Sequence, residues 1–184
     1  MATETRSRLH PEVFRLPVER IRSGYYSDAY FNLTKDLLEA DGHHPQVVMQ
    51  VFQRKESILG GIDEAIAVLK QGAGHYEGDK WVDGFGDLEV KALHEGDEIA
   101  PWETVMTIEG DYSLFAHLET VYLGCMARRT LVMRNVREVG QAAGEKEILF
   151  FPARASASAA RRERSAWRST DQTRAASVAR IAAW

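Results

Sequence analysis

The sequence contains a single cysteine, Cys125, among its 184 residues, which excludes an internal disulfide framework. No apolar run approaches the roughly 20 residues that a membrane-spanning helix needs. Residues 1–9 are polar and lack the apolar stretch of a secretory signal. Together these absences predict a soluble, cytoplasmic protein that does not use a membrane as a partner.

Several catalytic motifs are also lacking. There is no glycine-rich phosphate loop, no nucleophile elbow and no paired-cysteine motif. His43, His44 and His75 do not have the spacing of metal ligands, so we expect them at the surface. Residues 1–152 carry 16 Lys and Arg against 25 Asp and Glu, a net charge of −9, which does not favour a nucleic-acid partner.

The last 32 residues differ in character from the rest. Of these residues, 23 are Ala, Arg or Ser, and the segment carries a net charge of +5. One hypothesis is that this basic segment binds an acidic partner, as in a regulatory or interaction protein.

Apolar residues make up 45% of the chain, enough for a sizeable core, and their periodicity predicts an α+β domain. The expected elements are a helical turn at 17–22, a strand at 47–54, a helix from Gly60-Gly61 to Gly72 or Gly74, a loop at 75–87, strands at 88–93 and 99–108, two helices within 113–143 ending at Gly144, and a short apolar strand at 148–152.

Two patterns suit the binding of a flat, charged ligand. The tyrosine-rich stretch 25–30, which includes Asp28 and Tyr30, could stack on an aromatic ring and position it. At the end of the strand expected at 47–54, Arg54 and its neighbour Lys55 could grip phosphates. Taken alone, each pattern is more often structural, as a packed surface turn or as strand charges that discourage aggregation.

A third pattern follows the strand expected at 148–152. The ring of Phe151 could stack on an aromatic acid, and Arg154 could meet its carboxylate or a phosphate. Residues at the C-terminal end of a barrel strand tend to be catalytic or binding residues. The alternative is a core phenylalanine followed by a solvated arginine.

The turn at 94–98 contains Glu95-Gly96-Asp97 and resembles the hairpin of lipoyl- and biotin-carrier domains. A carrier needs a lysine on an exposed hairpin tip, whereas the nearest one, Lys91, lies inside the preceding strand. We therefore expect the hairpin to be structural, with a carrier-like or other non-catalytic binding module as the alternative function.

Taken in order, these patterns resemble the N-terminal domain of the nicotinate and nicotinamide phosphoribosyltransferases, which are type II phosphoribosyltransferases. The resemblance covers roughly residues 14–154 and depends on the order and spacing of its segments. These segments are 27–30, 51–55, the helix after Gly60-Gly61, 95–97, 108–110, 118–120, Asn135 and 148–154.

The resemblance implies a flexible N-terminus at 1–13, a small β barrel-sandwich with helices at 14–146, and the first strand of an α/β barrel at 147–154. In the family, about 200 further residues complete that barrel. Where the family has Asp or Glu followed by Phe-Gly, this chain has Phe150-Phe151-Pro152, which indicates a divergent branch. We expect residues 155–184 to be disordered or the product of a reading-frame shift, and this chain by itself to be an inactive fragment.

The family resemblance also implies roles for particular residues. Members are homodimers in which Asp28 and Tyr30 would reach the base pocket of the other subunit, and Arg54 would meet phosphates across the same interface. Phe151 would cover the other face of the pyridine, and Arg154 would lie at the mouth of the pocket. The implied reaction joins nicotinate to phosphoribosyl pyrophosphate, giving nicotinate mononucleotide and pyrophosphate, with Mg²⁺ and, in many members, ATP as cofactors.

Overall fold

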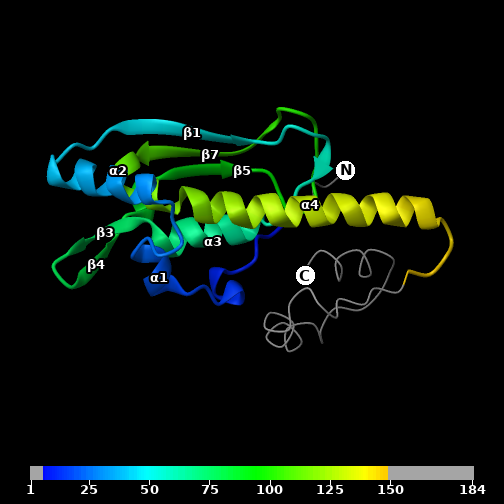
Figure 1. Ribbon diagram of the computed structural model, residues 1–184, viewed down its shortest axis with the longest axis horizontal. Coiled ribbons are helices and arrows are strands. Elements are labelled where there is room, and N and C mark those ends of the chain that lie inside the picture. Colours follow the sequence, from blue (N-terminus) through cyan, green and yellow to red (C-terminus); the bar gives the residue numbers. More distant parts are fainter. Residues whose placement is uncertain (1–5, 149–184) are drawn as a thin grey trace.

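The structure is a computed structural model that describes residues 6–148 (Figure 1). It combines helices and strands, so the predicted α+β class is confirmed. In chain order the elements are η1 (Pro11–Phe14), α1 (Val18–Arg22), α2 (Ala29–Ala40), β1 (Gln46–Phe52), β2 (Ser57–Ile58), α3 (Ile62–Gly72), β3 (Gly74–Glu77), β4 (Lys80–Asp83), η2 (Phe85–Asp87), β5 (Glu89–Ala92), β6 (Glu98–Ile99), β7 (Thr104–Asp111), η3 (Tyr112–Leu114), η4 (Ala116–Leu118) and α4 (Glu119–Ala143).

The principal sheet has the strand order β1-β7-β5, with β7 antiparallel to both neighbours. Two smaller antiparallel pairs, β2 with β6 and β3 with β4, lie outside it. All three sheets are open in the described part of the chain, so the small barrel expected there takes the form of separate open sheets. No helix within residues 6–148 is long and apolar enough to cross a membrane.

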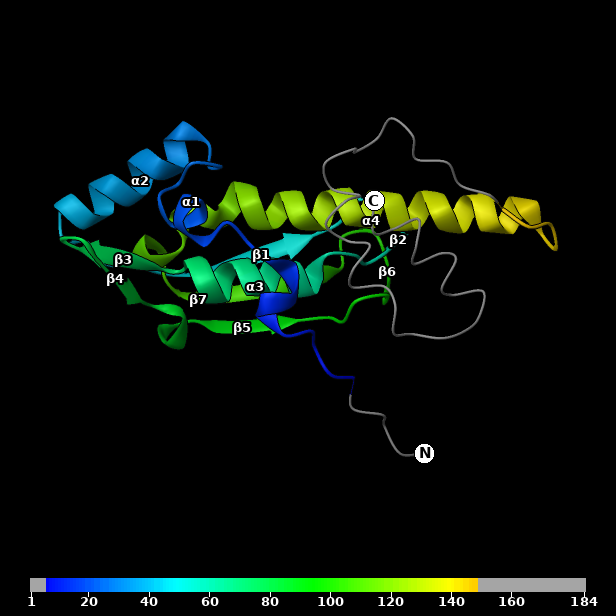
Figure 2. The ribbon, with the colours of Figure 1, turned by 90° about the horizontal axis from the view of Figure 1, so that it is seen from below.

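Strand β1 shows why the sheet has one covered face. Val47, Met49 and Val51 pack against the core, whereas Val48 is 63% exposed and Phe52 is 45% exposed. Side chains alternate between the two faces of a strand, so this pattern buries one face only. Helices α3 and α4 run beside each other along the sheet (Figures 1 and 2). The alternation expected for the strand at 47–54 is confirmed.

The core lies between α3, the start of α4 and the inner face of the sheet. Helix α3 places most of its residues in it, including Ile62, Val68 and Leu69, which are all fully buried. Strand β7 contributes Met106 and Ile108 from the opposite side. The expected helix after Gly60-Gly61 is therefore confirmed, and it is the central element of the domain.

The two glycines before α3 allow it to approach α4 closely. Gly61 has φ +84°, and a Cβ there would lie 2.6 Å from the backbone oxygen of Cys125 in α4. A Cβ on Gly60 would lie 3.0 Å from the backbone carbon of Arg129. Any larger residue would push the helices apart, so this dipeptide is a packing requirement.

The prediction of a loop at 75–87 is wrong in part, because this segment contains most of the hairpin β3–β4. Gly78, with φ +60°, forms the turn, and Tyr76 pairs across it with Trp81 at a ring distance of 4.9 Å. The glycines and aspartates of this stretch concealed two strands that are each only four residues long. Cross-strand aromatic pairs of this kind stabilise short hairpins.

The two helices expected within 113–143 are also wrong. A single helix, α4, covers Glu119–Ala143 and is preceded by the short turns η3 and η4. One face of this helix stays buried through Met126, Thr130 and Val136. Gly144 ends the helix with φ +59°, as expected.

The hairpin expected over 88–108 is correct in its pairing and wrong in its connection. Strand β5 pairs with β7, with Val90 opposite Ile108. The intervening chain does not form a tight turn, because β6 leaves to pair with β2 and a further turn follows at residues 100–103. Helix α2 was not among the expected elements.

Candidate functional site

Asp28 joins the start of α2 to the start of α4. Its backbone N–H donates to Thr120 Oγ1 at 3.2 Å, and the Thr120 hydroxyl donates to Asp28 Oδ2 at 3.1 Å. Asp28 occupies the N-cap position of α2, yet its side chain makes no hydrogen bond to that helix. The carboxylate therefore fixes the position of α2 against α4.

Tyr30 presents an exposed ring on the first turn of α2. The side chain is 60% exposed, and its ring lies 4.0 Å from that of Phe31 at an angle of 41°. Desolvation, followed by the charges of Asp28 and Glu119, raises the pKa of the Tyr30 hydroxyl above 10.0, so it stays protonated at neutral pH. An exposed tyrosine ring of this kind can stack on a flat ligand.

Arg54 follows the far end of β1. Its guanidinium carbon lies 5.9 Å from the centre of the Trp102 ring, and Trp102 lies 5.3 Å from the ring of Phe52. Among residues 6–148 the Arg54 guanidinium has no hydrogen bond or ion pair, because only its backbone N–H is bonded, to Gln53 Oε1 at 2.8 Å. The charge is thus available for an anionic ligand.

The structure does not bring the candidate residues together. Asp28 and Tyr30 lie against the first turn of α4, whereas Arg54 lies beside the turn at residues 100–103. Within the described chain, no hydrogen bond, ion pair or ring contact joins the two groups. Phe151 and Arg154, the other two candidates, lie outside the described residues.

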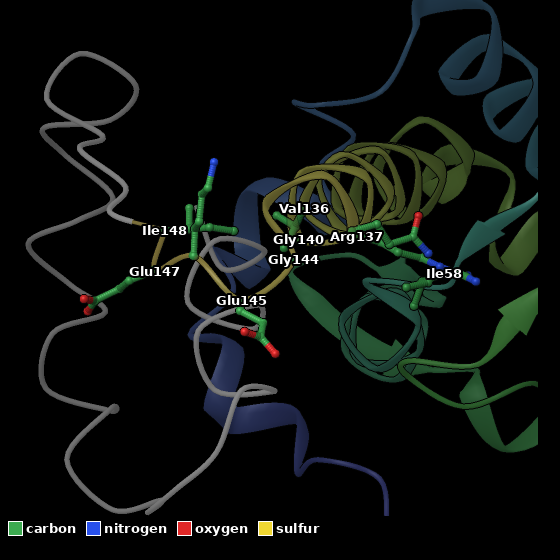
Figure 3. Close-up of a pocket in the computed structure, with 10 residues that line it drawn as sticks. Ile58, Val136, Arg137, Gly140, Gly144, Glu145, Glu147 and Ile148 are labelled. Carbon is green, nitrogen blue, oxygen red and sulfur yellow. The ribbon is translucent and has the colours of Figure 1, made fainter.

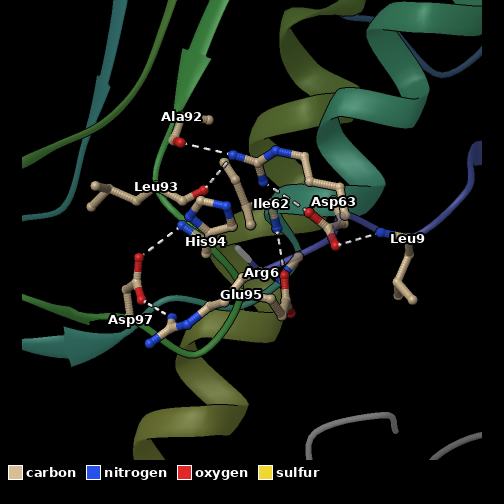
Figure 4. A network of polar contacts seen from close by, with 11 residues as sticks. Arg6, Leu9, Ile62, Asp63, Ala92, Leu93, His94, Glu95 and Asp97 are labelled. Atoms are coloured by element: carbon tan, nitrogen blue, oxygen red, sulfur yellow. Dashed lines mark hydrogen bonds and ion pairs between the residues drawn. The ribbon is translucent and has the colours of Figure 1, made fainter. Parts of the chain in front are cut away.

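Glu95 acts as a remote cap for α3 (Figure 4). Its carboxylate accepts hydrogen bonds from the backbone N–H groups of Gly61, at 2.7 Å, and Ile62, at 3.0 Å. Desolvation at this position raises the pKa of Glu95 and outweighs these hydrogen bonds, which lower it. A carboxylate at a helix N-terminus pairs with free backbone donors and with the helix dipole.

The rest of the Glu95-Gly96-Asp97 turn is also structural. The carboxylate of Asp97 accepts the N–H of His94 at 2.8 Å and pairs with Arg6. Gly96 donates its N–H to the oxygen of Leu59. The structural interpretation of this turn agrees with these contacts, and Lys91 lies in β5, paired with Glu89 at 2.9 Å rather than on a hairpin tip.

The described part of the N-terminal lead-in contacts this same region. Arg8 donates to Asp63 Oδ1 at 2.9 Å and to the backbone oxygens of Ala92 and Leu93. The N–H of Leu9 donates to the other oxygen of Asp63 at 3.1 Å. These bonds attach the chain before η1 to α3 and to the end of β5.

Two buried basic side chains lie between α2, η4 and the β3 edge. Lys35 Nζ donates to the backbone oxygens of Gly74 and Ser113 and pairs with Glu39 at 2.7 Å. His117 is 1% exposed. Burial, followed by the charge of Lys35, lowers the pKa of His117 to about 3, although the backbone of Gly72 acts to raise it, so its ring is neutral.

A cavity of about 640 Å³ lies away from both candidate groups, between β2 and the end of α4 (Figure 3). Ile58, Val136 and Ile148 form its apolar walls. Arg137 reaches it but pairs with Glu98 at 3.0 Å. Because much of its lining is the chain that leads out of α4, we do not assign a ligand to it.

No group of three or more His, Cys, Asp or Glu side chains within residues 6–148 is arranged to hold a metal ion. The Mg²⁺ and ATP expected from the family resemblance stay predictions.

A family model described as the N-terminal domain of quinolinate phosphoribosyl transferase matches residues 28–130, more than half of the chain. The chain belongs to this family. The match begins at Asp28 and extends into α4, so this phosphoribosyltransferase domain includes both candidate groups of the described structure.

Solved structures share the fold of this chain. The nicotinate-nucleotide pyrophosphorylase from Pyrococcus furiosus is 27% identical, with a TM-score of 0.60 over 74% of this chain. NadC from Streptococcus pyogenes is 15% identical, with a TM-score of 0.54 over 75% of this chain. The human nicotinic acid phosphoribosyltransferase is 17% identical, with a TM-score of 0.52 over 67%. The last two likenesses concern the fold alone.

The phosphoribosyltransferase domain is much shorter than these neighbours. The alignments cover 33% of the Pyrococcus furiosus chain, 45% of the Streptococcus pyogenes chain and 30% of the human chain. The comparison with curated protein sequences gives no significant match.

The family expectation is confirmed at the level of a type II phosphoribosyltransferase N-terminal domain. The roles of Asp28, Tyr30, Arg54, Phe151 and Arg154 stay predictions. Sequence reasoning gave no role to Trp102, and it named Thr120 only as part of the family-like segment 118–120; their side chains contact Arg54 and Asp28. A threonine in the first turn of a helix and a tryptophan after a proline carry no signal of such distant contacts.

Proposed function

We propose that this chain supplies the N-terminal part of a nicotinate phosphoribosyltransferase, which joins nicotinate to phosphoribosyl pyrophosphate and releases pyrophosphate. The match of the family model to residues 28–130 supports the phosphoribosyltransferase part of this proposal, and the choice of nicotinate as the base comes from the sequence resemblance. The exposed ring of Tyr30 supports it, as does the Arg54 guanidinium, which has no hydrogen bond or ion pair within residues 6–148, because the two substrates offer an aromatic ring and a pyrophosphate group.

In this reaction the pyridine nitrogen attacks C1 of the ribose while the C1–O bond to pyrophosphate breaks. Tyr30 would hold the plane of the pyridine, and Asp28 would fix Tyr30 by anchoring the start of α2 to Thr120. Arg54 would bind the negative charge that accumulates on the leaving pyrophosphate. Mg²⁺, when bound to that pyrophosphate, would neutralise further charge, and ATP coupling is proposed only from the family resemblance.

We propose that the complete site forms between two subunits. Tyr30 and Arg54 both face outward and belong to separate clusters, so each would serve a pocket formed with another part of the assembly. Helix α2 continues the exposed surface of Tyr30 with Leu33 and Leu37, which are 60% and 63% exposed. An apolar helix face of this kind suits contact with a partner subunit.

The remaining groups would come from a catalytic barrel, since the neighbours are two to three times as long as the aligned region. A hybrid enzyme tests this. Residues 1–148 are joined to the barrel of the Pyrococcus furiosus pyrophosphorylase, and formation of mononucleotide is assayed with nicotinate, nicotinamide and quinolinate in parallel.

We expect the hybrid to form nicotinate mononucleotide, and the full chain assayed alone to form none. Tyr30→Ala should raise KM for the base several-fold to about tenfold, because one ring stack is lost. Arg54→Ala should raise KM for phosphoribosyl pyrophosphate, and Arg20→Ala, at another exposed arginine, should change neither constant. Equal kinetics for all three variants would contradict the residue roles, and use of quinolinate in preference to nicotinate would contradict the choice of substrate.

A further inference from the structure

The turn at residues 100–103 is held firmly against the end of β1. Ala100 accepts the N–H of Glu103 at 3.2 Å, and Glu103 Oε2 accepts the N–H of Ala100 at 2.7 Å. The N–H of Trp102 donates to the backbone oxygen of Gln53 at 2.6 Å, immediately before Arg54. The turn and the strand end are therefore attached to each other at this point.

Trp102 occupies a backbone position that does not suit it. Its φ is +67°, in the left-handed region, where glycine and asparagine are favoured. Pro101 precedes it, and the pair has the signature of a type II turn, in which glycine usually takes the position of Trp102. Strained positions of this kind are concentrated at functional sites.

Burial does not explain the tryptophan either, because its side chain is 63% exposed. The contacts that it makes are with Phe52, at a ring distance of 5.3 Å and an angle of 34°, and with the guanidinium of Arg54 at 5.9 Å. The second distance is within the reach of a cation–π contact, about 6 Å. Trp102 thus has an exposed side chain and a strained backbone, and its indole lies beside Arg54, the arginine for which we propose a phosphate role.

We propose that Trp102 is a positioning residue: its indole, projected by the turn at residues 100–103, orients the Arg54 guanidinium toward the pyrophosphate of phosphoribosyl pyrophosphate. This inference rests on the proposed function, because it needs Arg54 to bind phosphate. The indole restricts the flexible arginine before the ligand arrives, so less conformational entropy is lost on binding.

The test uses the full chain labelled with nitrogen-15, and inorganic pyrophosphate as the probe. The Nε–Hε signal of Arg54, identified by its loss in Arg54→Lys, should carry a ring-current shift that Trp102→Leu removes. In titrations followed by that signal, Trp102→Leu should weaken pyrophosphate binding about two- to fivefold, the value of an exposed cation–π contact. Trp102→Phe keeps an aromatic ring, so it should retain most of the ring-current shift and most of the pyrophosphate affinity of the wild type.

Trp102→Gly separates positioning from stability. Glycine favours the φ of this position, so the melting temperature should stay unchanged or rise while binding weakens as in Trp102→Leu. A fall in melting temperature together with binding would show a merely structural tryptophan and overturn the proposal.

Two further outcomes distinguish failure of this inference from failure of the proposed function. If Arg54→Ala weakens binding, whereas Trp102→Leu binds as the wild type does, the inference fails and the role of Arg54 stands. If Arg54→Ala weakens pyrophosphate binding no more than Arg20→Ala does, both in the full chain and in the hybrid enzyme, the phosphate role of Arg54 fails and the inference fails with it.

Discussion

At the start of α3, Glu95, Asp63 and Asp97 each accept hydrogen bonds from the chain around them, whereas Tyr30 and Arg54 face outward from α2 and from the end of β1. Both regions lie within the segment that matches the family model. The difference shows that residues within one family-like stretch can have different roles. The three carboxylates stabilise the fold, whereas Tyr30 and Arg54 expose a ring and a charge that a ligand or a partner could contact.

The comparison predicts the largest effect at the contact of α3 with α4. Gly61→Val would place a Cβ 2.6 Å from the backbone oxygen of Cys125 at a residue with φ +84°. We expect the free energy of unfolding to fall by about 3 kcal/mol, from left-handed strain together with overpacking. Urea unfolding followed by circular dichroism measures this.

Gly124→Ala is the matched control, because a Cβ at that position of α4 would meet nothing within 4 Å. It should raise stability by up to about 1 kcal/mol, as alanine favours a helix interior. Equal effects of the two substitutions would show that the close approach of the helices does not limit stability.

His117 gives the second effect, and it depends on pH. Its folded-state pKa of about 3 lies below the ordinary value of 6.5. As the pH falls below 6.5, the unfolded chain takes up a proton at His117 and the folded chain does not. The free energy of unfolding should therefore fall, by up to about 1.4 kcal/mol per pH unit, until the pH reaches the folded-state pKa.

Stability curves at pH 7.0, 6.0, 5.0 and 4.0, compared between the wild type and His117→Leu, isolate this contribution. The difference between the two proteins should grow in favour of the variant as the pH falls. Parallel curves would mean that the imidazole is protonated, or reached by water, in the folded protein.

Removing the cap of α3 should have a smaller effect. Glu95→Ala leaves the N–H groups of Gly61 and Ile62 without their carboxylate, and we expect a loss of about 1–2 kcal/mol. Glu98→Ala serves as the control in the same segment, because its pair with Arg137 is at the surface and should contribute about 0.5 kcal/mol or less. Thermal unfolding of both variants decides whether Glu95 caps the helix or is one more surface charge.

The outward-facing region should respond least in stability. Tyr30→Ala removes a side chain that is 60% exposed, so the free energy of unfolding should change by less than about 0.5 kcal/mol. Phe31→Ala, at the adjacent residue with 8% exposure, should cost about 3 kcal/mol or more. A large loss of unfolding free energy in Tyr30→Ala would show that this tyrosine stabilises the fold, and would contradict the difference drawn between the two regions.

Sequence reasoning succeeded where a long periodic pattern had one partner to pack against. The alternation of β1 and the stripe of α3 each predicted an element and its buried face. It failed at β3 and β4, where strands of four residues lie among glycines and aspartates, and at α4, where one continuous helix stands in place of the two that were expected. Short strands depend on cross-strand contacts such as that of Tyr76 with Trp81, which the linear sequence does not reveal.

The candidate site divides in the same way. Asp28, Tyr30 and Arg54 were chosen from their residue types and their order in the chain, and the structure places them in two separate groups. Thr120 and Trp102 could not be chosen, since they contact Asp28 and Arg54 from 92 residues away in one case and across a strained turn in the other.

The sequence by itself determined the α+β class, the central helix after Gly60-Gly61 and the family resemblance, because these follow from periodicity, glycine positions and motif order. Only the tertiary structure decided that Glu95 caps α3, that His117 is buried, and that Trp102 lies beside Arg54. Each of these depends on which distant segments the packing of the core brings into contact, and local sequence preferences do not specify such contacts.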